Sequence, residues 1–137
     1  MVRKSAGFQE IEHTADWELL VWGPDLVGLL EQAARGMNAL AEIRVADTPR
    51  LQRRLQLPAG DPERLLVSFL TELLWQAERD NLAFDTFDLV ISEDILDANL
   101  QGAEILFRLK EIKAVTFHNL SIRQTRRGLE ANIVLDV

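Results

Sequence analysis

Two long segments of the sequence carry apolar residues at helical spacing. In the first, apolar side chains recur every three or four positions, at Leu26, Leu29, Leu30, Ala33, Ala34, Met37, Leu40 and Ala41. The second contains Leu65, Leu66, Phe69, Leu70, Leu73, Leu74 and Ala77. Pro24 and Pro62 suit a first helical turn, where a missing N–H costs nothing, and Asp61 can cap the second helix. The pattern predicts two amphipathic helices, each with a single wide apolar face.

Shorter segments alternate apolar and polar residues, as half-buried strands do. They are predicted at residues 17–22, 51–57, 84–92, 98–109, 113–122 and 129–136. The last four are separated by turn-like stretches, which indicates a β-meander at the end of the chain. The apolar residues change parity between Phe117 and Leu120, so a bulge or bend is predicted near His118-Asn119.

The order β-α-β-α-β-β-β-β predicts an α+β fold in which one mixed or antiparallel sheet has both helices packed on one face, as a two-layer sandwich. The chain has 137 residues and no internal repeat or linker-like segment, so we expect a single domain over residues 1–137.

The amino-acid composition and net charge argue against several classes of protein and kinds of binding site. No segment approaches the roughly 20 apolar residues that cross a bilayer, and the N-terminus lacks the apolar run of a secretory signal, so we expect a cytoplasmic protein without membrane contact. Without cysteine, any metal must be bound through oxygen or imidazole ligands. The formal net charge of −7 opposes stable direct binding to a nucleic-acid backbone, because such binding depends on Lys and Arg.

Titratable residues gather near the start of the first predicted strand. The sequence contains neither a glycine-rich phosphate loop nor a Gly-x-Ser-x-Gly elbow, whereas Glu12, His13 and Asp16 fall within five residues. In an extended segment Glu12 and Asp16 would share one side, where two carboxylates could begin a site for a hard cation. The alternative is that both acids are solvated charges and that His13 is a turn residue.

A second acidic feature lies at the end of the last predicted strand. Leu129, Ala131, Ile133 and Leu135 point one way along this strand and Asp136 points the other. The terminal carboxylate of Val137 is then held beside Asp136, and such an oxygen-only ligand set suits Ca²⁺ or Mg²⁺. The alternative is a charge that only keeps a sheet edge soluble. Lys113 and His118 lie on one predicted strand with opposite nominal faces, and each taken alone is typical of a surface residue.

These segments resemble the motifs of the archease family. The family's Asp/Glu-His-Thr-Ala-Asp motif is matched by residues 12–16, and its Lys-Ala-Val/Ile-Thr-Tyr-His-like motif by residues 113–118. The Asp136-Val137 ending is also similar to that of archeases, and the resemblance extends over the whole chain. Two departures are a short loop at residues 110–112 and Phe117, which stands where tyrosine is common.

The resemblance implies a protein that performs no catalysis itself. Archeases activate an RtcB-type RNA ligase in tRNA splicing, and they promote guanylylation and repeated turnover of that ligase. The positions that match the motifs make Asp16, Asp136 and Val137 the expected metal or functional ligands, with a divalent ion, Ca²⁺ or Mg²⁺, as the expected cofactor. Glu12, His13, Lys113 and His118 are expected to have supporting roles.

Two other function classes fit parts of the same pattern. A small metal-dependent hydrolase would use Asp16 and Asp136 as ligands and His13 or His118 as a base. A general protein-interaction or chaperone-like module would need only the amphipathic helices and an acidic surface.

Overall fold

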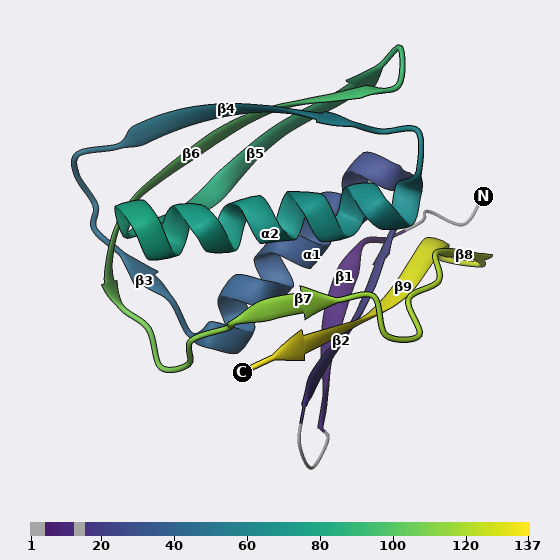
Figure 1. The fold of residues 1–137 in the computed structure, drawn as a ribbon, viewed down its shortest axis with the longest axis horizontal. Coiled ribbons are helices and arrows are strands. Elements are labelled where there is room, and N and C mark those ends of the chain that lie inside the picture. Colours follow the sequence, from purple (N-terminus) through teal and green to yellow (C-terminus); the bar gives the residue numbers. More distant parts are fainter. Residues whose placement is uncertain (1–4, 13–15) are drawn as a thin grey trace.

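The computed structural model describes residues 5–12 and 16–137, and this part of the chain forms two α-helices and two antiparallel sheets (Figure 1). We call sheet 1 the one in which the strands run in the order β1-β2-β9-β7, with β8 also paired to β9. Its strands are β1 (Gly7–Glu12), β2 (Trp17–Gly23), β7 (Ala114–Thr116), β8 (Arg123–Thr125) and β9 (Gly128–Asp136). In sheet 2, β6 (Ile95–Phe107) pairs with β3 (Arg44–Val45), β4 (Leu51–Pro58) and β5 (Leu82–Ser92).

Both predicted helices are confirmed. Helix α1 spans Leu26–Ala41 and begins at Asp25, whose side chain accepts a hydrogen bond from the Gly28 N–H at 2.8 Å. Pro24 therefore lies just before the cap and not in the first turn. Helix α2 spans Pro62–Asp80, and Asp61 caps it as predicted. No helix in the described ranges is long and apolar enough to span a bilayer.

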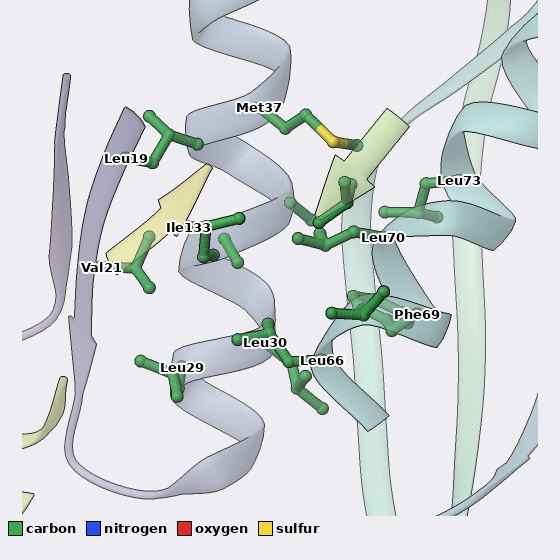
Figure 2. Close-up of a cluster of buried hydrophobic side chains, with 14 of the residues drawn as sticks. Leu19, Val21, Leu29, Leu30, Met37, Leu66, Phe69, Leu70, Leu73 and Ile133 are labelled. Carbon is green, nitrogen blue, oxygen red and sulfur yellow. The ribbon is translucent and has the colours of Figure 1, made fainter. Parts of the chain in front are cut away.

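The helices pack between the inner faces of the two sheets. Helix α1 contacts β1, β2 and β9 of sheet 1 and also reaches β5, whereas α2 contacts β4 and β5 of sheet 2 and also reaches β7. Figure 2 shows how Leu19, Val21 and Ile133 of sheet 1 face the apolar side chains of α1 and α2. Burial of these side chains, at roughly 25 cal/mol per Å², supplies the main favourable term for folding.

The α+β class and the antiparallel pairing are as predicted, but the expectation of one sheet and a terminal meander is wrong. Strands β5 and β6 do form a hairpin, and its turn at Glu93 and Asp94 has φ of 53° and 60°. The chain then leaves sheet 2 and enters sheet 1, where β9 lies between β2 and β7 (Figure 1). Two sheets form because α1 and α2 together have apolar surface to cover on both sides.

The region after β6 departs from the predicted strand over residues 113–122. Strand β7 ends at Thr116, and a turn follows in which the Leu120 N–H donates to the Phe117 carbonyl at 3.0 Å. Asn119 has a φ of 52°, a conformation that asparagine tolerates better than most residues. The parity change near His118 therefore marks a turn at the end of β7, which agrees with the predicted bend and not with a bulge.

Candidate acidic site at one end of sheet 1

The pairing of β2 with β9 brings two distant acids to the same end of sheet 1. These strands are antiparallel, with Trp17 opposite Leu135. Asp16 directly precedes Trp17 and Asp136 directly follows Leu135, so the register places the two acids beside each other. Both are exposed, whereas Leu135 is fully buried. Asp136 thus points away from the core, as the alternation along β9 predicts.

Strand β7 borders this end of the sheet on the other side of β9. Ala114 pairs with Asp136, and the Lys113 N–H donates to the Asp136 carbonyl at 2.7 Å. This bond fixes the backbone of Asp136 and the start of Val137. The two family-like motifs therefore meet the end of β9 at one end of sheet 1, and we call this place the acidic end.

A cavity of about 130 Å³ lies on the outer face of sheet 1 beside the acidic end. Its walls are Asp16, Glu18, His118, Asn119, Asn132 and Val134. Two predicted site residues, Asp16 and His118, thus share one cavity although they lie in separate motifs. Lys113 is not part of it, because its position before Ala114 directs it to a different cavity on the inner side.

Hydrogen bonds between neighbouring strands organise the polar wall of this cavity. The Asn132 Nδ2 donates to Glu18 Oε2 at 2.7 Å, and the Arg123 Nη2 donates to Asn132 Oδ1 at 3.0 Å. Arg123 also lies 3.9 Å from the Glu130 carboxylate. These bonds connect the wall residues Glu18 on β2 and Asn132 on β9 with Arg123 on β8.

The turn after β7 positions the imidazole. The His118 N–H donates to Thr116 Oγ1 at 3.2 Å, and the ring Nε2 lies 3.2 Å from the Asn119 Nδ2. The turn thus holds the imidazole of His118 next to the Asn119 side chain at the wall of the cavity.

The first residue of the first motif is the last residue of β1. Strand β1 ends at Glu12, which pairs with Trp17 of the antiparallel β2. Glu12 lies on β1 and Asp16 directly precedes β2, so the two acids do not lie along one strand, which a shared side by alternation required. His13 lies outside the described residues, and so does the side chain of Glu12.

The donors at the acidic end are of the kind that a hard cation takes. Carboxylates of Asp16 and Asp136 and a main-chain oxygen of Val137 are oxygen ligands, which Ca²⁺ and Mg²⁺ prefer. Over residues 5–12 and 16–137, no group of three or more His, Cys, Asp or Glu side chains surrounds one point.

Sequence patterns alone did not single out Glu18, Asn119 and Asn132 as cavity residues. Glu18 and Asn132 share the outward parity of Asp16 and Asp136, so alternation along β2 and β9 carried a usable signal. Asn119 carried no comparable signal, because its place depends on the turn after β7.

The chain matches the family described as "Archease protein family (MTH1598/TM1083)" over residues 8–137. It is 32% identical to "Protein archease" of Methanosarcina acetivorans, with 95% of each chain covered, and 30% identical to "Protein archease" of Methanosarcina mazei, also with 95% of each covered. A solution structure of Methanobacterium thermoautotrophicum protein 1598 superimposes with a TM-score of 0.73 at 27% identity, with 96% of this chain and 99% of that chain covered. A crystal structure from Thermotoga maritima, described as an archease and possible chaperone, has the same fold, with a TM-score of 0.73 at 21% identity over 100% of this chain and 98% of that chain. This chain therefore belongs to the archease protein family.

Proposed function

We propose that the protein is a non-enzymatic activator of an RtcB-type RNA ligase in cytoplasmic tRNA splicing. The observation that carries this proposal is the antiparallel pairing of β2 with β9, which brings Asp16 and Asp136 to one exposed edge. The chain's membership of the archease family supports this function for the acidic end. The ligase, and not this chain, would hold the RNA, because a net charge of −7 disfavours contact with a phosphate backbone.

The acidic end would act by presenting carboxylates to the metal and nucleotide site of the ligase. Asp16, Asp136 and a main-chain oxygen of Val137 are the residues that would hold a divalent ion, Ca²⁺ or Mg²⁺. When bound, such an ion neutralises negative charge on a transferring phosphoryl group. The exposed Asp16 and Asp136 carboxylates would orient the ligase at the contact, and the neighbouring His118 would add a hydrogen-bonding group from the turn after β7.

A ligation assay with limiting ligase tests this function. RNA joining and the ligase–guanylate intermediate are followed over several turnovers, with and without this protein. Faster guanylylation and sustained turnover are expected. An active cognate ligase that is indifferent to the protein would overturn the proposal. Titration calorimetry with Ca²⁺ and Mg²⁺, before and after treatment with a chelator, tests the metal separately from the ligase.

A chaperone-like activity is a second candidate, because three apolar side chains near the end of β6 face solvent. Leu106, Phe107 and Leu109 are 67%, 50% and 58% exposed. Exposed apolar patches on soluble proteins often mark contact sites for other proteins. Suppression of aggregation of several unrelated unfolded proteins would favour this function, whereas dependence of one ligase alone on the protein would favour the activator.

A further inference from the structure

A second cavity, separate from the acidic end, lies where the C-terminal halves of α1 and α2 meet the start of β5. Its volume is about 180 Å³, and its walls include Met37, Leu73, Leu74, Ala77, Phe84 and Ile112. The Asn38 Nδ2 donates to the Phe84 carbonyl at 2.8 Å and so ties α1 to β5 at the wall. The cavity is therefore held open by regular elements and not by a loop alone.

The segment between β6 and β7, residues 108–113, closes this cavity on one side, and we call it the crossover. Its course is fixed because the N–H groups of Leu109 and Lys110 both donate to the Ala41 carbonyl, at 2.9 and 3.2 Å. Ile112 is buried and adds to the apolar wall. In Figure 1 the crossover lies at the same end of the molecule as β3 and the end of α2.

The charged groups at this cavity are mainly cationic. The crossover contributes Arg108, Lys110 and Lys113, against the two acids Glu78 and Glu111. In the part of the chain that the structure describes, the side chains of Arg108 and Lys113 form no hydrogen bond or ion pair, so both charges remain available to a ligand. Small-molecule sites combine apolar walls with placed polar groups, and here ten apolar residues line the cavity beside six polar or charged ones.

We propose that this cavity binds a small molecule that has an apolar body of about six carbons and one carboxylate group. A dry cavity of roughly 150 Å³ lined by apolar side chains can hold a benzene molecule, and this cavity is of similar size. The apolar body packs against Met37, Leu73 and Phe84. The carboxylate remains at the entrance, where Arg108 and Lys113 donate to it.

The crossover also connects this cavity to the acidic end. The Lys110 Nζ lies 3.3 Å from the centroid of the Trp17 ring, next to Asp16, and the Lys113 N–H donates to the Asp136 carbonyl. A ligand that draws the side chains of Lys110 and Lys113 toward the cavity therefore moves residues that lie next to Asp16 and Asp136. Only this effect of the ligand on the acidic end rests on the proposed function, because binding of the small molecule to the cavity is measured without the ligase.

Nuclear magnetic resonance titration of the intact protein with four matched probes tests the site. The probes are hexanoate, hexylammonium, 1-hexanol and acetate. Hexanoate is expected to give saturable shifts of the amides of Leu74, Lys110 and Ile112, whereas acetate lacks the apolar body and gives none. Hexylammonium should bind about fivefold more weakly than hexanoate, which corresponds to about 1 kcal/mol, the upper value for an interaction with partly exposed charges.

Two variants locate the binding, and a third serves as the control. Leu74→Trp fills the cavity and should abolish the hexanoate shifts, while Arg108→Ala should weaken binding about threefold. Arg126→Ala removes an exposed charge in the turn between β8 and β9 and should leave binding unchanged. The absence of saturable shifts with hexanoate would overturn the proposal, as would equal affinity for hexylammonium. If Leu74→Trp does not fold, the probe series and Arg108→Ala still decide between these outcomes.

Discussion

The ammonium group of Lys110 lies over the indole of Trp17, with Nζ 3.3 Å from the ring centroid. This cation–π contact links the crossover to the first residue of β2. Lys110→Ala is expected to lower the free energy of unfolding by about 1 kcal/mol, within the range for such a contact at a partly exposed site. Urea denaturation followed by tryptophan emission measures the change.

Lys113→Ala is the matched control for this contact, because Lys113 lies in the same segment and its side chain has no partner in the described residues. Its effect on stability should stay within about 0.5 kcal/mol. A double-mutant cycle with Trp17→Leu isolates the coupling. Equal losses from both lysine substitutions, or no coupling in the cycle, would contradict a stabilising contact between Lys110 and Trp17.

Asp16→Asn and Asp136→Asn test the acidic end directly. Each substitution removes a charge but keeps the shape of the side chain, and both acids are exposed. We expect each variant to lose ligase stimulation and divalent-ion binding, with the free energy of unfolding changed by less than about 0.5 kcal/mol. Ligation assays, calorimetry and thermal unfolding of the same preparations provide the comparison.

Asp88→Asn is the control for these variants, since Asp88 is an exposed acid on β5 in the other sheet. This variant should stimulate the ligase fully. If Asp16→Asn or Asp136→Asn also stimulates fully, these carboxylates do not carry the activity.

The helices and the last strand could be predicted from sequence because local signals define them. Asp61 and Pro62 mark the start of α2, and the alternation along β9 continues to its final residue. Strand β1 was missed because most of its residues are exposed, so its two faces differ little in polarity. Strand β3 has only two residues, too few to show a period.

The division into two sheets depends on contacts that are distant in sequence. Lys110-Glu111 has the composition of a hairpin turn, but the N–H groups of Leu109 and Lys110 bind the Ala41 carbonyl at the end of α1. These two hydrogen bonds direct the chain from sheet 2 to sheet 1. Alternation along β9 is a local signal, and it indicated the outward face of Asp136. The cavity shared by Asp16 and His118 depends on the turn after β7, which alternation does not predict.

The ion pair between Arg50 and Asp85 gives a pH-dependent prediction. The Arg50 Nη1 donates to Asp85 Oδ2 at 3.0 Å, and this hydrogen bonding lowers the pKa of Asp85 below its ordinary value of 3.8. Because the folded-state pKa is the lower one, the stabilisation is present above the unfolded-state pKa. It is lost as pH falls through the folded-state pKa.

Asp85→Asn should therefore lower the free energy of unfolding by about 0.5 kcal/mol at pH 7, a small value because both side chains are partly exposed. The difference from the unsubstituted protein should shrink as the pH is lowered from 5 toward 2. Denaturation at several pH values measures it. A difference that stays constant over this range would show that the ion pair does not stabilise the fold.

Substitution by alanine should lower stability at Gly102 and raise it at Gly60. A Cβ atom at Gly102 would lie 1.9 Å from the Ala83 carbonyl oxygen, where β5 and β6 approach each other next to the register shift between Phe84 and Thr86. Backbone atoms cannot yield as a flexible side chain can, so Gly102→Ala should cost about 3 kcal/mol. At Gly60, a Cβ would meet nothing within 4 Å, and its φ is not positive. Gly60→Ala should therefore raise stability by about 0.5 kcal/mol, because alanine restricts the unfolded chain.

Urea denaturation of both variants checks this pair. Helix α2 begins two residues after Gly60, so circular dichroism shows whether either variant alters helix content. A Gly102→Ala protein as stable as the original would mean that β5 and β6 can separate at this point without loss. The register shift between Phe84 and Thr86 would then not depend on close approach of the two backbones.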